Sequence, residues 1–206
     1  MTTATFAGFD PTPLQRQARW KRAEYAFWLI PVAAYFGFTE QLALLSQMAI
    51  TALFAVSLDL ILGYAGIVSL GHAAFFGIGA YAAGLMATHG WNEPLTGLAG
   101  AALAAGAAGL LTSFLVLRGS DLTRLMVTLG VALMLFEMAN KLTGITGGVD
   151  GLQGIEMKPI LGLFPFDLYG KTAYIYAALV LFALFWLARR IVHSPFGWSL
   201  QAIRDN

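Results

Sequence analysis

The sequence predicts an all-α, polytopic membrane protein: a bundle of about six transmembrane helices with both termini in the cytoplasm. Three observations predict this fold. Hydrophobic residues make up 58% of the 206 residues and charged residues only 11%, which is too little polar surface to cover a water-soluble globule. Five or six apolar stretches are long enough to cross a bilayer. Lysine and arginine are also distributed unevenly between the turns that separate these stretches.

The composition excludes several other kinds of site. The chain has no cysteine, so it has no disulfide, thiolate metal ligand or cysteine nucleophile. Its three histidines, His72, His89 and His193, fall at different expected membrane depths, and no pair shares a helix face as metal ligands do. No phosphate-binding loop motif occurs, and no basic pattern indicates nucleic acid. We therefore expect no metal and no cofactor in this chain.

The elements follow one another in a simple order. Residues 1–22 form a polar N-terminal segment with no pattern of a cleaved signal peptide, and residues 23–192 form the membrane domain. Residues 141–172 contain GITGGVDGLQG and two prolines, which indicates an ordered loop outside the membrane. Residues 193–206 are a polar, amphipathic piece. The expected crossings are residues 24–39, 42–62, 64–88, 95–117, 125–140 and 173–188.

The positions of the cations orient the bundle. With six crossings, nine cations fall on one side and three on the other, so the positive-inside rule places both termini in the cytoplasm. If residues 64–88 were a re-entrant hairpin, Arg118 would move outside and this asymmetry would weaken. We therefore favour a full span, continuous or broken. The nine are Arg16, Arg19, Lys21, Arg22, Arg118, Arg124, Arg189, Arg190 and Arg204, and the three are Lys141, Lys158 and Lys171.

The glycine-rich stretch 63–88 carries the main candidate site. Read as one helix, it has a bulky apolar face and a small, polar face that contains Ser69 and His72. Polar groups in hydrocarbon are costly, so the second face is expected to meet protein or water. His72 either marks a pathway or only hydrogen-bonds a neighbouring helix. The polar face comprises Ala65, Ser69, His72, Phe76, Gly79 and Ala83. The candidate pathway residues are Ser69, His72, Phe76, Gly66, Gly71 and Glu137.

Two further patterns have a structural and a functional interpretation. Small residues recur on one face of the fourth stretch, as Gly97, Ala101, Ala105 and Gly109. Such spacing lets helix backbones approach closely in lipid, so we expect ordinary helix packing there. Glu137 lies near the outer end of the fifth crossing, where it either pairs with Lys141 four residues later or faces the pathway.

Four motifs in order resemble one family. The run LDLILGYAGIVSLGHAAFFGIGAYAAG is similar to the signature of permease subunits of branched-chain amino-acid ABC importers, in particular the LivM type. The segments RGSDLTRLMVTLGVALMLFE, GITGGVDGL and SPFGWSLQAIRDN resemble three later motifs of the same family. Together they span residues 58–206. The resemblance implies a multi-pass permease of a bacterial inner membrane, and not an enzyme.

The resemblance also implies partners and site residues. A second permease subunit, two cytoplasmic ATPase subunits that bind ATP, and an extracytoplasmic solute-binding protein would complete the transporter in the lipid bilayer. The outer loop would contribute Gly147, Gly148, Asp150 and Gly151. The cytoplasmic segment would contact an ATPase through Phe196, Gly197, Leu200, Ile203 and Arg204, and an apolar edge at Leu200 and Ile203 fits such a groove.

Departures from the family pattern leave the solute open. Asp59 and Ile67 stand where the family often has Asn and Gln, and Val149 where Pro or Ser is frequent. Alternative solutes are urea, short amides or another small polar molecule. An alternative of another class is an ATP-independent solute channel. An intramembrane hydrolase built on Ser69 and His72 is disfavoured, because such spacing on one helix fits packing equally well. Family members continue for several more spans, so we expect residues 1–206 to be a truncated product or fragment.

Overall fold

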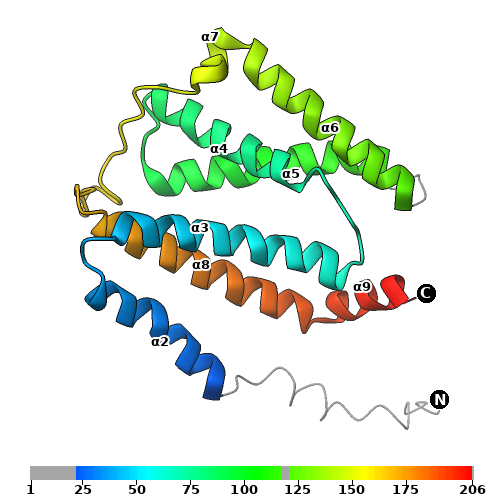
Figure 1. Ribbon diagram of the computed structural model, residues 1–206, viewed down its shortest axis with the longest axis horizontal. Helices are drawn as coiled ribbons and strands as arrows, with labels where there is room; N and C mark the ends of the chain where they lie inside the picture. Colours follow the sequence, from blue (N-terminus) through cyan, green and yellow to red (C-terminus); the bar gives the residue numbers. More distant parts are fainter. Residues whose placement is uncertain (1–21, 117–120, 206) are drawn as a thin grey trace, which may run out of the picture.

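The computed structural model describes residues 22–116 and 121–205, and these are almost entirely helical (Figure 1). Within them the only strand-like pairing is an isolated bridge between Ile160 and Phe164. Residues 1–21 of the expected N-terminal segment, and Arg118, therefore lie outside the described residues. The helices are α2 (Arg22–Gly37), α3 (Leu42–Asp59), the π-helical turn η1 (Leu60–Tyr64), α4 (His72–Thr88), α5 (Pro94–Val116), α6 (Asp121–Lys141), α7 (Thr143–Thr146), the 3-10 turn η2 (Gly148–Asp150), α8 (Lys171–Val192) and α9 (Pro195–Asp205).

The helices form two packed groups. In one group α3 and α8 lie side by side and run in the same direction, with α2 against α8 (Figure 1). Their first residues meet where Gly170 contacts Ala43, and their last turns meet around Asp59 and Arg189. In the other group α4 packs along α5, and α6 lies against both. The segment that follows η1 connects the two groups.

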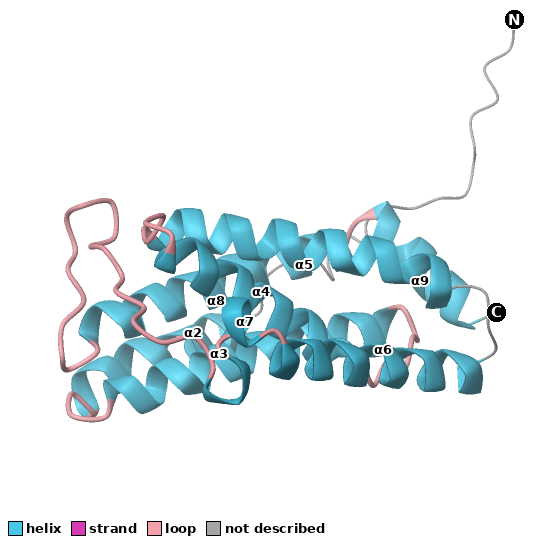
Figure 2. Cartoon of the chain, turned by 90° about the horizontal axis from the view of Figure 1, so that it is seen from above, coloured by secondary structure: helices cyan, strands magenta, loops and turns pink. Residues whose placement is uncertain are grey.

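Four helices within the described residues have the length and apolar composition needed to cross a membrane. They are Leu42–Tyr64, Pro94–Phe114, Leu122–Lys141 and Lys171–Val192. The remaining long helices, α2 and α4, have 16 and 17 described residues. The fold class of the chain is therefore the predicted one, an all-helical bundle with several apolar helices of spanning length. The chain segments 38–41, 89–93 and 142–170 gather at one end of this bundle, and α9 lies at the other (Figures 1 and 2).

Aromatic and polar contacts hold α2 against α8. The Trp28 ring packs edge-on against Phe182, with ring centroids 4.7 Å apart. The Tyr174 hydroxyl donates a hydrogen bond to the Pro31 carbonyl over 2.8 Å. At the other end, the Arg189 guanidinium lies 2.7 Å from the Glu24 carboxylate. These contacts hold α2 at its first turn and in its middle.

The predicted small-residue face of α5 packs against α4. A Cβ on Gly79 would lie 3.5 Å from the Ala101 carbonyl oxygen and 3.8 Å from the Ala105 Cβ, and one on Gly97 would lie 3.9 Å from the Ala83 Cβ. This confirms the expected helix packing, because the missing side chains let the two backbones approach closely. Gly109 is different: it borders a hollow, described below, instead of α4.

The stretch 63–88 is not one continuous helix. The second helix ends in the π-helical turn η1, residues 66–71 have no helical structure, and α4 begins only at His72. Gly66 has φ +67°, which an L side chain rarely adopts and a helix cannot continue through. Of the two predicted alternatives, a continuous and a broken stretch, the broken one is therefore correct. The assignment of Ala65 and Ser69 to one helical face with His72 is wrong, since the 3.6-residue spacing does not extend across the break.

Candidate functional site

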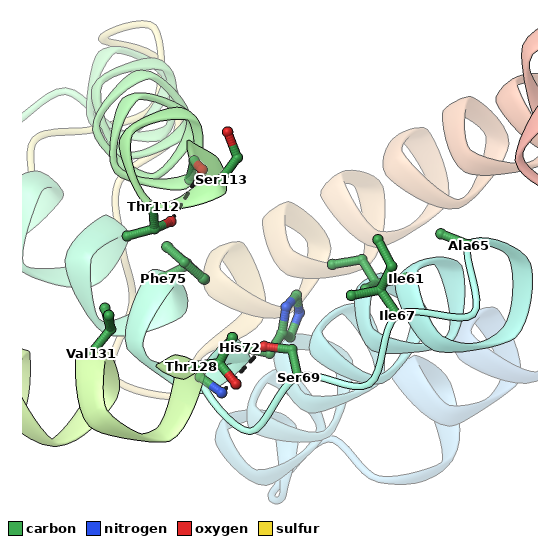
Figure 3. A pocket seen from close by; sticks show the side chains of 12 residues that line it. Ile61, Ala65, Ile67, Ser69, His72, Phe75, Thr112, Ser113, Thr128 and Val131 are labelled. Atoms are coloured by element: carbon green, nitrogen blue, oxygen red, sulfur yellow. Dashed lines mark hydrogen bonds between the residues drawn. The ribbon is translucent and has the colours of Figure 1, made fainter. Parts of the chain in front are cut away.

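A hollow of about 400 Å³ lies beside the break (Figure 3). It is bounded by the end of η1, the non-helical segment 66–71, the start of α4, and the facing sides of α5 and α6. Its walls are mostly apolar, with a few hydroxyl groups and one imidazole. Among the described residues, no carboxylate, lysine or arginine side chain lines it. The lining residues are Ile61, Ala65, Ile67, Ser69, Gly71, His72, Phe75, Gly109, Thr112, Ser113, Thr128 and Val131.

The backbone of the break finds hydrogen-bond partners in the protein. The Ile67 N–H donates to the Ile61 carbonyl over 3.2 Å. The Leu70 N–H donates to the Thr128 hydroxyl over 3.3 Å, and the Gly71 N–H to the Ser69 hydroxyl over 3.3 Å. Irregular backbone at membrane depth is tolerated only where it is buried in protein or lines a cavity. The hollow and these bonds meet that requirement.

Gly71 allows α4 and α6 to touch. It is buried, and a Cβ at this position would lie 2.6 Å from the Thr128 carbonyl oxygen. That distance is shorter than real Cβ contacts, and the obstacle is backbone, which cannot rotate away as a side chain can. A glycine is therefore needed here for close approach, and the approach brings the Thr128 hydroxyl to the break.

His72 joins α4 to α3 and also lines the hollow. Its Nε2 lies 2.8 Å from the Ser57 hydroxyl oxygen. The Ser57 hydroxyl also lies 2.7 Å from the Phe54 carbonyl, to which it donates its single hydrogen. The His72 Nε2–H must then be the donor to Ser57. The Phe54 ring covers one side of the imidazole, with centroids 5.2 Å apart. His72 thus makes the contact expected of a packing residue, and its ring borders the hollow as well.

The other predicted pathway residues are divided by the structure. Ser69 and Gly71 line the hollow with His72. Phe76 does not line it; its ring packs on Phe54 with centroids 5.5 Å apart. Gly66 is the first residue of the break, and it lies against Arg204 instead of lining the hollow. Glu137 is exposed on α6, away from the lining, and forms no ion pair with Lys141 although both residues are described.

The sequence reasoning missed four hydroxyl side chains near the hollow. Thr128 is only 6% exposed, and its hydroxyl accepts from the break while donating to the Leu125 carbonyl. Thr112 and Ser113 line the α5 wall, and Ser57 holds His72. Each hydroxyl also bonds a carbonyl three or four residues earlier, which satisfies it inside an apolar helix. The only available signal was a hydroxyl within an apolar span, and that signal does not indicate what the side chain faces.

The glycines of loop 141–172, the predicted outer loop, have a structural reason. Gly147, Gly148 and Gly151 have φ of 77°, 63° and 69°. A Cβ on Gly147 would also overlap the Gly151 carbonyl. The buried Thr146 hydroxyl donates to backbone carbonyls at the end of α6, which fixes the loop to that helix. A second, more polar hollow of about 710 Å³ lies between this loop and the end of α4, and Asp150 is among its lining residues.

The predicted coupling residues face different ways on α9. Phe196 is 62% exposed. Gly197 is buried, and a Cβ there would overlap the Val192 carbonyl at the end of α8, which explains the glycine. Leu200 is half-buried, and the side chain of Ile203 lies outside the described residues. Arg204 is exposed, and its guanidinium donates a hydrogen bond to the Gly63 carbonyl.

A family model described as "Branched-chain amino acid transport system / permease component" matches residues 41–206. The chain belongs to this family. This confirms the resemblance inferred from the four motifs. The match covers the break, the hollow, the outer loop and α9. Its description is that of a permease component of a transport system.

Two curated relatives are permeases named LivM. The "High-affinity branched-chain amino acid transport system permease protein LivM" of Escherichia coli (strain K12) is 27% identical over 190 residues, which is 82% of this chain and 44% of the relative. Its namesake from Salmonella typhimurium is 27% identical over 173 residues, 73% of this chain and 40% of the relative. The chain therefore spans about two fifths of the length of these relatives. No solved structure matches it.

Residues 22–116 and 121–205 contain no group of three or more histidine, aspartate or glutamate side chains that could hold a metal ion. The imidazole of His72 is bonded to a serine, and those of His89 and His193 both approach backbone carbonyls of their own helices. The chemistry available at the hollow is therefore hydrogen bonding and apolar contact.

Proposed function

We propose that this chain forms part of a membrane permease subunit of an ATP-driven ABC importer, which moves branched-chain or related amino acids into the cell. The family match over residues 41–206 carries this proposal. The broken helix and its hollow support it, because transporters place substrate sites at discontinuous helices near the middle of the membrane. The membrane would be the bacterial inner membrane, and the domain 23–192 would be its permease region.

In this proposal the chain crosses the membrane six times, with both termini in the cytoplasm. The six long helices alternate in direction between the two ends of the bundle, with α2, α4 and α6 running one way and α3, α5 and α8 the other (Figure 1). Of the eight described lysines and arginines, five lie at the end that carries α9, which supports a cytoplasmic location; they are Arg22, Arg124, Arg189, Arg190 and Arg204. Accessibility tags at positions 90 and 150 would be extracytoplasmic, and a cytoplasmic signal at either would contradict this topology.

The hollow would form part of the solute pathway. Its apolar walls, such as Ile61, Ile67 and Val131, suit an aliphatic side chain and favour it over urea or a short amide. The hydroxyls and His72 offer hydrogen bonds to the polar end of an amino acid. The N-terminus of α4 opens at the same place without a side-chain cap, and helix N-termini favour a carboxylate.

The proposed partners are a second permease subunit, two cytoplasmic ATPases that bind the ATP, and an extracytoplasmic solute-binding protein. The outer loop 141–172 would face the solute-binding protein. The amphipathic α9 would face an ATPase, with Phe196 as its most exposed large apolar residue among those predicted for this contact. An ATP-independent channel remains the alternative of another class, since it would use similar glycine-rich helices.

Uptake of radiolabelled leucine tests the pathway assignment. Cells that express the transporter with its partner subunits would be compared with cells carrying His72→Leu. We expect uptake to fall about tenfold, the effect of losing roughly one hydrogen bond's free energy, with membrane insertion unchanged. His89→Leu is the matched control, because His89 is exposed in the outer turn. Wild-type uptake by His72→Leu would refute the role, and competition by urea but not leucine would favour the alternative solute.

A second experiment separates the importer from a channel. Leu200→Asp combined with Ile203→Asp places two charges on the proposed ATPase contact. For an importer, solute uptake should be lost while the ATPases still hydrolyse ATP. Unchanged uptake by this double variant would rule out the docking role and support the channel.

A further inference from the structure

The last turn of α9 is tied to the beginning of the break. The Arg204 guanidinium donates a hydrogen bond to the Gly63 carbonyl, 141 residues earlier in the chain. Gly63 lies in η1, at the C-terminal end of the long helix formed by α3 and η1. The last carbonyls of a helix lack partners within the helix and carry partial negative charge. A cation from α9 therefore caps this helix end.

The stem of the same side chain packs against the next glycine. Gly66 has φ +67°, and a Cβ at this position would overlap the Arg204 side chain, with Cβ and Cδ of Arg204 each 3.2 Å away. Both the conformation and the contact therefore need glycine at position 66. The Arg204 side chain thus contacts both Gly63, which lies in η1, and Gly66, which is the first residue of the break.

The residues held in this way continue directly into the wall of the hollow. Ala65, Ile67, Ser69 and Gly71 all line it, and His72 follows at the start of α4. Figure 3 shows Ala65, Ile61 and Ile67 on one side of the hollow and His72 and Ser69 below them. A displacement of α9 would therefore pull on this wall through Arg204.

We propose that Arg204 is a positioning residue that couples the placement of α9 to the shape of the hollow. In the observed arrangement it caps η1, packs on Gly66 and keeps segment 63–71 in place. The expectation that Arg204 contacts an ATPase stays a prediction, and the exposed side of α9 is available for such a contact. Only the source of the α9 movement, an ATPase, rests on the proposed function; the tie itself does not.

The chain offers a direct test because it has no native cysteine. Ile67→Cys places one thiol in the wall of the hollow, and its reaction with a water-soluble maleimide can be followed in proteoliposomes. Arg204→Met removes the hydrogen bond but keeps an apolar stem. We expect the labelling rate at position 67 to be about tenfold higher in Arg204→Met than with Arg204 intact, since the wall opens more often when a bond from a charged donor is lost. Arg204→Lys keeps the charge, and its labelling rate should lie between those two rates.

Two controls make the result specific. Arg190→Met removes a cation at the same end of the bundle, where the guanidinium lies over the Trp186 ring instead of the break, and it should leave the rate unchanged. Gln153→Cys reports on the exposed outer loop and should label equally in all variants. Equal rates in Arg204→Met and Arg190→Met would overturn the proposal. A parallel rise at position 153 would also overturn it, because it would show general unfolding.

The assembled transporter provides a readout that a merely structural role would not change. Arg204→Met should lower the solute taken up per ATP hydrolysed, while the subunits still purify together. Failure of leucine uptake in the wild type would count against the proposed function but would leave the labelling result intact. An unchanged labelling rate would count against Arg204 alone, so the two failures can be told apart.

Discussion

The two ends of α4 use glycine in opposite ways. From the middle of α4 toward its C-terminal end, glycine allows packing: Gly79 lies against Ala101 and Ala105 of α5, and the absence of a side chain makes a close contact. At the N-terminal end of α4, Gly66 and Gly71 belong to the break, where Gly66 has a positive φ and Gly71 approaches the α6 backbone, and a hollow lies beside the break. Both regions belong to the same glycine-rich stretch of sequence.

This difference shows that the neighbours of a glycine decide its role. Gly79 is inside a helix and meets methyl groups, so it favours packing. Gly71 meets the backbone of α6, and Gly66 has a positive φ, so both support a turn that no other residue would form there. The packed end of α4 provides a fixed support, and the open end carries His72 beside the hollow.

The largest expected effect comes from filling the packed end. Gly79→Leu would place a large side chain against the Ala101 backbone, and overpacking of this kind costs about 1–3 kcal/mol. For a chain of this size, each kcal/mol lowers the unfolding temperature by roughly 2–4 °C. Gly106→Leu is the control, because no atom lies within 4 Å of a Cβ there. Equal unfolding temperatures for the two variants in detergent would contradict tight α4–α5 packing.

A smaller change should disturb the open end more locally. Gly71→Ala adds one methyl group 2.6 Å from the Thr128 carbonyl, so α4 and α6 must separate, at a cost of about 1–2 kcal/mol. Gly77→Ala, with nothing near its Cβ, should be neutral or gain up to about 1 kcal/mol from helix propensity. Thermal unfolding and leucine uptake measured on both variants would test this. A stable Gly71→Ala with normal uptake would mean that the close approach is not required.

The smallest effect is expected far from both ends of α4. Tyr174→Phe removes the hydrogen bond to the Pro31 carbonyl that holds α2 against α8, while the ring keeps its packing. Hydrogen bonds between membrane helices contribute about 0.6 kcal/mol on average, so the unfolding temperature should fall by only about 1–2 °C. Uptake should be unchanged. A larger fall in unfolding temperature for Tyr174→Phe than for Gly71→Ala would show that the α2–α8 contact contributes more to stability than the close approach at the break.

Much of the fold and part of the site followed from local patterns. The apolar runs predicted the long helices, the small residues of α5 predicted its contact with α4, and the loop signals predicted the turns around Gly147. The site was predicted less well. Ser69, Gly71 and His72 were found because they are unusual in an apolar stretch, whereas Thr128 and Ser57 come from other helices and have no distinctive spacing. Phe76 and Glu137 share helices with the lining residues, but their side chains point elsewhere.

The sequence by itself determined that the chain is a helical membrane protein of the branched-chain permease family. Hydropathy and motifs can be read from short segments taken in order along the chain, without knowing which segments are in contact. Only the tertiary structure decided where the third stretch breaks, which hydroxyls meet the break, and that Arg204 reaches Gly63. These depend on which backbones approach one another across many residues. The physical reason is that burial and turn geometry are set by partners distant in sequence, and a local pattern carries no information about them.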